Sequence, residues 1–501
     1  MNFNKHLSIV FLSAIFITFL FYRQSLGLNL VLFEVCFIAG LLLSKALPKT
    51  GTGLFCLSAL LISLFATLIT HSLFAYIVHF VVLFIFVGVL NYPKVTSLVN
   101  AVGLAFSSTV ETQAMFIKRV FRAKIKGKNL GGFLWKSRIF IIPLGIIFIF
   151  LIIYSASNPI FSDLISEIIQ TVNKGFLFLF KDLEIALFLT FFLALLISNF
   201  LVFRTPNSDI VTYDQNAKEQ LRRTKVRRKR FFKLPALRNE FKAGIFLFII
   251  LNILLLVLNI TDIYWVWFNF EWEGQSLKQF VHEGTYLLIF SILISMAVVL
   301  YFFRKNLNFY PKNRWLKYLA YAWIVQNAIL AFSVVVRNLW YINYFSLAYK
   351  RIGVFIFIVL TLFGLLSVFI KIRHKKSAFY LFKTNAIALV AVLVISSAIN
   401  WDSLIAKYNF SHSNTAFLHL EWLATLSDKA LPHLSKTKAE LAGIETIQRQ
   451  KFEDPRLTEN YPEYFNIIEK RKAAFKERWE SKSILSWNLA EYLAYKKLFI
   501  P

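Results

Sequence analysis

Cysteine is nearly absent from this sequence, and so are the charged residues that a water-soluble surface needs. The chain of 501 residues has two cysteines, Cys36 and Cys56, and both lie in apolar stretches. A thiolate metal site and a cysteine nucleophile are therefore excluded, and the chain after residue 56 carries no disulfide. Charged residues make up 17% of the chain, against about a quarter in soluble domains. This shortage excludes a water-soluble globular protein.

Sequence motifs for nucleotides and metals are also missing. Gly127-Lys128-Asn129 lacks both the glycine spacing and the hydroxyl of a phosphate-binding loop. The run from His282 to Tyr286 begins like a zinc-protease helix, but Tyr stands where the second His ligand would be. We therefore predict no cofactor and no metal site, and the sequence favours a protein that is not an enzyme.

Apolar residues, in contrast, are abundant and form long runs. They make up 57% of the chain, 55 residues are Phe, and the mean hydropathy is +0.60. About 20 apolar residues in a helix cross the roughly 30 Å hydrocarbon core of a bilayer. The runs predict an all-α integral membrane protein with about eleven transmembrane helices, at residues 7–22, 26–44, 53–70, 72–91, 139–155, 183–203, 241–261, 284–303, 315–336, 352–371 and 384–400. The run from residue 54 to residue 90 is too long for one span, and we expect it to break at His71.

Lysine and arginine outnumber acidic residues by 56 to 27, and most of this excess lies in segments on one side of the predicted spans. Because positively charged loops stay in the cytoplasm, we predict that the amino terminus lies inside and the carboxyl-terminal tail outside. The excess therefore needs no nucleic-acid partner. The expected partner is the bilayer, with anionic lipid headgroups at the basic loops. Alternatively, these charges only set the topology.

The pattern divides the chain into six regions. They are a four-span region at 1–91, a basic cytoplasmic amphipathic segment at 92–138, a two-span hairpin at 139–203, a basic cytoplasmic loop at 204–240, a five-span region at 241–400 and an extracytoplasmic tail at 401–501. In the tail the apolar spacing predicts a small helical module. The tail is also the place where we expect a protein partner, if there is one, and the oligomeric state stays open.

One predicted outer loop, residues 261–283, is rich in acidic and aromatic residues. Its ionisable residues are Asp262, Glu271, Glu273, His282 and Glu283, with Lys278 as the one basic residue. Carboxylates and an imidazole bind divalent cations or act as acid and base. The alternative is a belt of interfacial aromatic residues with solvated acids.

A second outer segment carries positive charge against the topological trend. Arg337, Tyr341 and Arg351 form a candidate anion site, because the planar guanidinium donates several hydrogen bonds to a carboxylate or phosphate. The alternative is that these arginines pair with Glu271, Glu273 or Glu283 of the neighbouring outer loop.

Polar side chains inside the predicted spans form the third group of candidates. Glu34 lies near the middle of its span, where a carboxylate is costly unless it is paired, protonated or wetted. It is the best candidate for proton or cation coupling, and the alternative is pairing with a polar neighbour. Gln326 and Asn327 also lie mid-span, and amides at such positions mostly join helices to one another.

A short segment after the last predicted span carries a resemblance to a known family. Asn400, Asp402, Tyr408 and Asn409 fit the pattern Asn-x-Asp-x-x-Ile-Ala-x-Tyr-Asn, and residues 423–432 and 337–351 add further agreement. The segment resembles a bacterial family of polytopic membrane proteins known only as a domain of unknown function, over roughly residues 240–435. This resemblance implies a multi-span bacterial inner-membrane protein with a helical outer tail, and no established activity. Alternatively, Asp402 caps a short helix and Asn409 ends it.

Three functions fit this sequence. The first is a transporter or flippase for an anionic or amphiphilic substrate, supported by the number of spans, by Glu34 and by the outer arginines. The second is a membrane sensor or regulatory scaffold whose outer tail binds a partner. The third is an integral membrane transferase that acts on a lipid or lipid-linked sugar, for which only the 261–283 loop offers outer carboxylates.

Overall fold

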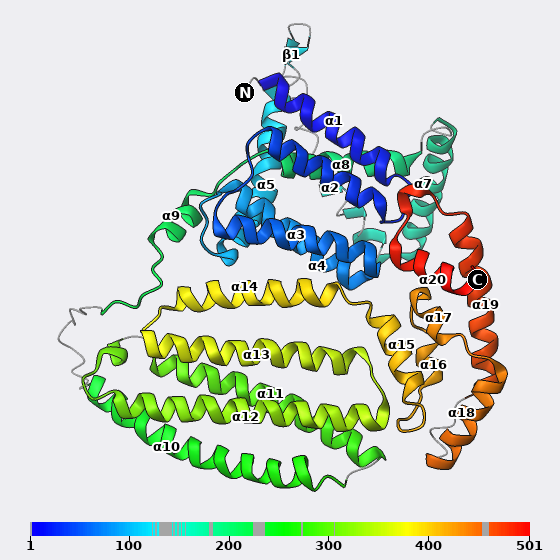
Figure 1. The fold of residues 1–501 in the computed structure, drawn as a ribbon. Helices are drawn as coiled ribbons and strands as arrows, with labels where there is room; N and C mark the ends of the chain where they lie inside the picture. The colour runs from blue at the N-terminus through cyan, green and yellow to red at the C-terminus, as the bar shows by residue number, and fades with distance from the viewer. Residues whose placement is uncertain are drawn as a thin grey trace.

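The computed structural model of this chain is almost entirely helical (Figure 1). It describes residues 3–122, 157–179, 184–223, 236–271, 274–304, 306–452 and 460–500, together with isolated positions between 124 and 155. The described part has one pair of strands, the two-residue β1 (Lys124–Ile125) and β2 (Lys128–Asn129). The prediction of an all-α architecture is confirmed.

The first half of the chain contains the helices α1 (Phe3–Phe21), α2 (Leu28–Leu43), α3 (Gly51–Thr70), α4 (Leu73–Asn91), α5 (Leu98–Arg122), α7 (Pro159–Leu179) and α8 (Ile185–Val202). Helices α1 to α5 and α8 pack into one bundle. Helix α1 packs along α8, α3 packs along α4, and α4 packs along α5. Phe86 and Leu104 are buried where α4 and α5 meet.

The second half forms another bundle. After the short α9 (Ser208–Asn216) it consists of α10 (Ala236–Asp262), the π-helix η1 (Ile263–Phe268), α11 (Gly274–Phe302), η2 (Asn306–Phe309), α12 (Arg314–Phe345) and α13 (Tyr349–His374). Helix α14 (Ala378–Ser397) lies between the two bundles and contacts α3, α4 and α5 on one side and α13 on the other (Figure 1). This single helix therefore joins the two halves.

Residues 401–500 fold as short helices against the ends of both bundles. They are α15 (Trp401–Ser411), α16 (Leu420–Leu423), η3 (Asp428–Ala430), α17 (Leu431–Leu434), α18 (Lys438–Lys451), α19 (Tyr461–Glu480), η5 (Ile484–Ser486) and α20 (Leu489–Phe499). Their apolar core includes Leu423, Leu431 and Phe475 and continues into Ile342 and Leu347 at the α12–α13 turn. The tail is helical as predicted, and it shares its core with the membrane-spanning part.

Eight described helices are long and apolar enough to cross a membrane, and α1 and α2 contain shorter apolar stretches. The predicted break at His71 is confirmed. Helix α3 ends at Thr70, His71 adopts a left-handed conformation with φ of 43°, and the Ser72 side chain accepts a hydrogen bond from the Ala75 amide at the start of α4. The predicted span at 139–155 lies mostly outside the described residues. The chain is therefore a multi-pass membrane protein.

Successive loops between the long helices lie by turns at one end of the bundles and at the other. At the end where residues 401–500 lie, which we call the tail end, the Leu28 amide donates to the Trp487 carbonyl at 2.9 Å. At the opposite end, which we call the basic end, the Leu221 amide donates to the Lys375 carbonyl at 2.9 Å. Thr50 likewise donates to the Pro93 carbonyl at 2.8 Å at the basic end. Successive long helices thus run in opposite directions between two consistent ends.

Helices α4 and α5 approach each other closely at Gly88. A Cβ atom built on Gly88 would lie 1.9 Å from the carbonyl oxygen of Ala101 in α5. The obstructing atom belongs to the backbone of a packed helix, so no side-chain rotation relieves the overlap. Glycine at this position therefore sets the spacing between α4 and α5.

We predict that Gly88→Ala lowers the stability of the folded protein by about 1–3 kcal/mol, because α4 and α5 must move apart. Gly40→Ala in α2 is the matched control, since a Cβ there meets nothing within 4 Å. The control should be neutral or stabilising by up to about 1 kcal/mol, as expected when alanine replaces glycine in a helix. Thermal denaturation of both purified variants in detergent measures the difference, and equal melting temperatures would contradict the predicted packing.

Candidate functional site

Glu34, the carboxylate predicted inside a span, is fully buried in the first bundle. It lies in α2, where its Oε1 is 2.7 Å from Nε2 of His79 in α4, and neither side chain is exposed. The Asn29 side chain fixes the start of α2, since it accepts from the Leu30 amide at 2.9 Å and donates to the Leu20 carbonyl at 3.1 Å. The turn between α1 and α2 therefore holds Glu34 at the same depth in the bundle as His79.

His79 has a second polar neighbour on the other side of its ring. Its Nδ1 lies 3.0 Å from Oγ of Ser63 in α3, and that hydroxyl donates to the Leu60 carbonyl at 2.9 Å. The single hydrogen of the Ser63 hydroxyl is used in the bond to the Leu60 carbonyl, so Ser63 Oγ acts as an acceptor towards His79. The contact is therefore a hydrogen bond when His79 Nδ1 carries a hydrogen. The three side chains form a line across α2, α4 and α3, which we call the buried triad.

The geometry of the buried triad requires one proton between Glu34 and His79. With a hydrogen on Nδ1, a neutral His79 presents the Nε2 lone pair to Oε1, and the contact is favourable only if one of those two atoms carries a proton. Without it, a carboxylate faces a lone pair at 2.7 Å in a low-dielectric interior. Among the described residues, Glu34 Oε2 has no hydrogen-bonding partner. The triad is therefore a candidate site for binding and releasing a proton.

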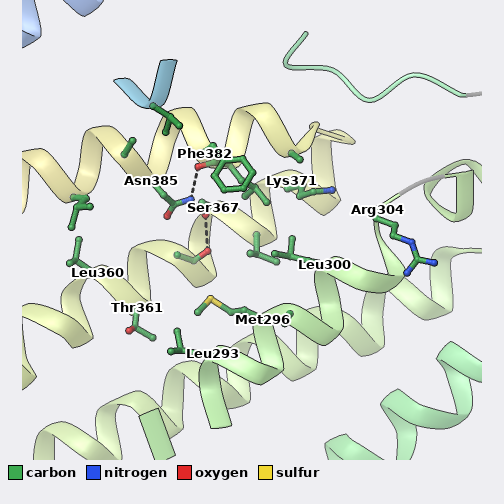
Figure 2. Close-up of a pocket in the computed structure, with 18 of the residues that line it drawn as sticks. Leu293, Met296, Leu300, Arg304, Leu360, Thr361, Ser367, Lys371, Phe382 and Asn385 are labelled. Atoms are coloured by element: carbon green, nitrogen blue, oxygen red, sulfur yellow. Dashed lines mark hydrogen bonds between the residues drawn. The ribbon is translucent and has the colours of Figure 1, made fainter. Parts of the chain in front are cut away.

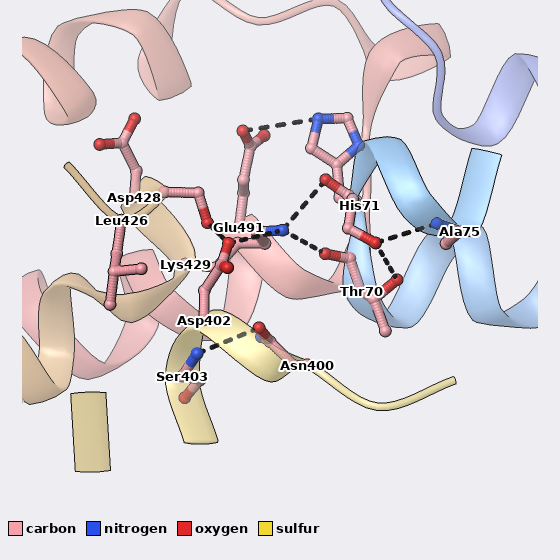
Figure 3. Close-up of polar contacts among 12 residues, drawn as sticks. Thr70, His71, Ala75, Asn400, Asp402, Ser403, Leu426, Asp428, Lys429 and Glu491 are labelled. Atoms are coloured by element: carbon pink, nitrogen blue, oxygen red, sulfur yellow. Dashed lines mark hydrogen bonds and ion pairs between the residues drawn. The ribbon is translucent and has the colours of Figure 1, made fainter. Parts of the chain in front are cut away.

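A second polar group lies at the tail end, where the two family-like segments meet (Figure 3). Asp402 in α15 accepts hydrogen bonds from the hydroxyls of Ser427 and Tyr349, and one of its carboxylate oxygens lies 3.3 Å from Nζ of Lys429. Lys429 is 7% exposed, and its Nζ donates to the carbonyls of Thr70 at 2.7 Å and His71 at 3.2 Å.

These two carbonyls belong to the end of α3. The carboxyl-terminal end of a helix carries unpaired carbonyls and partial negative charge, so an ammonium is favoured there. His71 Nε2 in turn lies 3.7 Å from Oε1 of Glu491 in α20, and Glu491 also accepts from Lys482 and Asn488. We call His71, Asp402, Ser427, Lys429 and Glu491 the junction cluster. It attaches the tail to the first bundle.

Burial and charge shift the pKa values in this cluster. Burial raises the pKa of Asp402, but the hydrogen bonds from Ser427 and Tyr349 and the charge of Lys429 outweigh it and hold the pKa below its usual value. Burial raises the pKa of Glu491 too, and Lys482 and Asn488 reverse the shift. For His71 burial lowers the pKa more than the charge of Glu491 raises it, and the result is a pKa of about 4. At neutral pH His71 is therefore uncharged and both carboxylates are ionised.

The other family-like residues have structural contacts. The expectation that Asp402 caps α15 is wrong, because the Asn400 side chain accepts from the Ser403 amide at 3.3 Å and Asp402 turns into the junction cluster. Asn409 does not end α15 either, since the helix continues to Ser411. Its side chain instead accepts from the Leu347 amide at 2.8 Å and donates to the Leu347 carbonyl at 3.0 Å.

The aromatic ring of Tyr408, the remaining family-like residue, stacks on His412 with 4.0 Å between ring centroids. This contact lies within α15 and its cap, so it connects no second helix. The family-like pattern therefore marks two different things, the junction cluster and the seam between α15 and the α12–α13 turn.

The predicted outer acid–histidine cluster is only partly described. Asp262 is buried, and its Oδ1 lies 2.6 Å from Nη2 of Arg337 in α12. Glu271 is exposed, and the side chains of Glu273, His282 and Glu283 lie outside the described residues. Among the described residues no three potential metal ligands gather. The cluster stays a prediction.

The predicted anion site contains two arginines with partners inside the chain. Arg337 pairs with Asp262, which is not among the three glutamates that the sequence predicts as its partners. Arg351 donates to the carbonyls of Phe345 and Ser346, and its guanidinium lies 4.4 Å from the ring centroid of Tyr341. Both arginines therefore stabilise the tail end of α12 and α13, and anion binding there stays a prediction.

The mid-span amides join α10 to α12. Gln326 Nε2 donates to Asn252 Oδ1 at 2.7 Å, and the Gln326 carbonyl accepts from Asn259 at 3.1 Å. Asn327 donates to the Trp323 carbonyl at 2.7 Å within its own helix. These contacts hold two helices in register.

Sequence reasoning identified Glu34 but not its partners, and it missed the junction cluster. A signal for the triad was present, because Glu34, Ser63 and His79 all lie six or seven residues from the tail end of their helices. Helices that start at the same membrane surface place such residues at equal depth. For the junction cluster no such signal exists, since Lys429 and Glu491 lie far from His71 in sequence.

Comparison with known proteins gives one match. The model of a family described as "Domain of unknown function (DUF4153)" matches residues 7–437, which is most of the chain. No curated protein and no solved structure matches the chain. The matched range includes the buried triad and, in the junction cluster, every residue except Glu491.

We predict that Lys429→Met loosens the tail, because it removes two hydrogen bonds to the end of α3 and leaves Asp402 without its cation. The expected cost is about 2–4 kcal/mol. The measurement is hydrogen exchange at the backbone amides of α20 in nanodiscs. Lys436→Met is the control, since Lys436 makes a 3.9 Å pair with Glu440 and a cation–π contact with Phe410, each worth less than about 1 kcal/mol at a partly exposed position. Equal exchange in both variants would exclude Lys429 as the attachment.

The junction cluster should also loosen in acid. An undocked histidine has a pKa of about 6.5, whereas burial lowers that of His71 to about 4. The docked form therefore binds fewer protons, and the stability that His71 contributes above pH 6.5 is lost as the pH falls towards 4. Hydrogen exchange of α20 across this range, corrected for intrinsic rates, measures the loss. His71→Gln should flatten the dependence, and an unchanged profile in that variant would assign the effect to another group.

Proposed function

Since the chain belongs to the DUF4153 family, a family of unknown function, and is a multi-pass membrane protein, we propose that it is a proton-linked transporter or flippase for an anionic or amphiphilic substrate. The observation that carries this proposal is the buried pair of Glu34 and His79. Ionisable residues inside membrane spans are costly, and they commonly belong to ion or proton pathways.

The chemistry of the buried triad supports proton coupling. With one proton shared, Glu34 and His79 attract each other and hold α2 against α4. When that proton leaves, the carboxylate and the Nε2 lone pair repel each other, and this repulsion favours separation of α2 from α4. A proton taken up or released at this site therefore changes the preferred distance between α2 and α4. Such a two-state element is what ion coupling needs.

The proposed orientation follows the distribution of positive charge. The basic end carries the loops around residues 204–223 and 371–383, and we place it in the cytoplasm. The tail then lies on the outer side of a bacterial cytoplasmic membrane. The buried triad, six or seven residues from the tail end, lies roughly 10 Å below the outer surface of the spans. A proton from outside would have a short route to it.

The contacts at the tail end support the other two functions less directly. A transferase acting on lipid-linked sugars needs a free outer carboxylate; Asp262 is committed to Arg337, which leaves the exposed Glu271 among the described acids of this loop. A regulatory scaffold needs a tail that a partner can reach, and this tail shares its core with α12 and α13. Both stay predictions.

We predict that Glu34→Gln removes the carboxyl group of the buried triad while leaving the fold intact, because the amide of glutamine can donate to His79 Nε2. Infrared difference spectra of the purified protein in nanodiscs, recorded across a pH titration, should lose the carboxylic acid carbonyl band. Glu184→Gln is the control, since Glu184 is an exposed partner of Arg23. A titration spectrum that Glu34→Gln leaves unchanged would exclude proton binding at the triad.

The same variants test transport in cells. Lipids and glycans of the envelope are profiled by mass spectrometry in a deletion strain complemented with each form. Wild-type protein and Glu184→Gln should restore any accumulated or missing species, and Glu34→Gln should not. A profile that deletion leaves unchanged would count against transport and favour the regulatory function.

A further inference from the structure

A groove of about 750 Å³ lies between α11, α13 and α14 (Figure 2). Val99 of α5 also lines it, so the groove lies where the two bundles meet. It is open along one side, since Phe382 on α14 is 64% exposed. Its volume falls within the range of about 300–1,000 Å³ that is typical of small-molecule sites.

The dimensions of the groove match one leaflet of a bilayer. Along α14 it extends from Ala378 to Leu389, which is about 16 Å at 1.5 Å per residue. The hydrocarbon of one leaflet is about 15 Å thick, half of the roughly 30 Å core. The groove starts at the basic end of α14 and reaches about the middle of the membrane. A lipid of the leaflet at the basic end therefore has the right length to lie in it.

The wall of the groove suits a hydrocarbon chain. Its few polar side chains in the middle are already satisfied, because Asn385 donates to Ser367 Oγ at 2.9 Å and Thr361 donates to the Phe357 carbonyl at 2.8 Å. The remaining wall is formed largely by residues such as Leu293, Met296, Leu300 and Leu360 (Figure 2). The occupant of this section gains by burying apolar surface and needs no polar atoms.

The basic end of the groove carries positive charge. Lys371 is 3% exposed, and its Nζ donates to the backbone carbonyl of Phe303 at 2.8 Å. Within the described residues no carboxylate pairs with Lys371. Arg304 also lines this end and is about 3.7 Å from Glu240, with both side chains partly exposed.

Further basic residues lie at the end of α13, on the adjoining turn and in α14: Arg373, Lys375, Lys376 and Lys383. Within the part of the chain that the structure describes, the carboxylate that pairs with them is that of Glu219, at 3.4 Å from Lys376 and 2.8 Å from Lys383. Positive charge therefore exceeds negative charge around the mouth of the groove.

We propose that this groove binds an anionic phospholipid from the leaflet at the basic end, with an acyl chain between α11, α13 and α14 and the headgroup near Lys371 and Arg304. The length of the groove, its apolar wall and the excess of positive charge at one end all select the same occupant. This site goes beyond the proposed transport function, because it depends on lipid binding alone and not on a proton at Glu34.

The test uses full-length protein in nanodiscs that contain either phosphatidylglycerol or phosphatidylcholine with a photoreactive diazirine in the acyl chain. Cross-linked peptides are located by mass spectrometry. Phosphatidylglycerol should label residues 360–389 about fivefold more than phosphatidylcholine, since one basic group near the headgroup strengthens anionic binding by about that factor, and Arg304 is already paired with Glu240 whereas Lys371 contacts a carbonyl. Equal labelling by the two lipids would overturn the proposal.

Two pairs of variants separate the groove from the general surface. Ala297→Trp fills the groove from α11, where Ala297 is exposed, and should abolish labelling. Ala186→Trp on the exposed face of α8 is its control and should not. Lys371→Gln keeps a donor to the Phe303 carbonyl but removes the charge, so it should abolish the preference for phosphatidylglycerol. Lys312→Gln, an exposed lysine at the same end, should retain it.

The Glu34→Gln variant distinguishes this proposal from proton coupling. Labelling in that variant should equal that of the wild-type protein. Persistent labelling together with restored complementation would support the lipid site and count against proton coupling at Glu34. Labelling that survives Ala297→Trp, or a lipid preference that survives Lys371→Gln, would overturn the groove as the binding site.

Discussion

Inside a bilayer every polar group must find its partner within the chain, and much of this structure follows from that constraint. Backbone groups satisfy it by forming long helices. The side chains satisfy it in pairs: Glu34 with His79, Gln326 with Asn252, and Asp262 with Arg337. Each pair joins two different helices, so the energetic need to pair polar groups also specifies which helices are neighbours.

This constraint also explains how far the sequence predicts the fold. Long apolar runs predict the helices, and the break at His71 was predictable because a 37-residue run cannot be one span. Pairing between distant residues was not predictable. The predicted outer loop at 261–283 offers Arg337 four acids, and Arg337 binds Asp262 at the end of α10. Asp402 has the pattern of a helix cap, but Asn400 takes that position and frees Asp402 for Lys429.

The tail presents a different physical problem, because its helices are polar outside and too short to be stable alone. They obtain stability from an apolar core shared with Ile342 and Leu347 and from ionic contacts that satisfy the end of α3. The family-like residues therefore describe an attachment. Asp402 orients Lys429, and Lys429 donates hydrogen bonds to two carbonyls at the end of α3 that have no partner within the helix. A tail held in this way is part of the membrane protein rather than an independent module.

The positions of the buried triad and the lipid groove are linked through one helix. His79 lies on α4, α4 packs against α14, and α14 forms one wall of the groove. A change in the distance between α2 and α4 can reach the groove only if α4 moves with respect to its other neighbours. At Gly88 the backbones of α4 and α5 approach closely, so a displacement of α4 also disturbs its packing against α5. Since α14 contacts both of them and α13 as well, it connects the helix of His79 to one wall of the groove. Occupation of the groove does not need a proton at Glu34, so any coupling between the two sites would require α14 to have two stable positions, because packed helices shift between discrete arrangements and do not deform gradually.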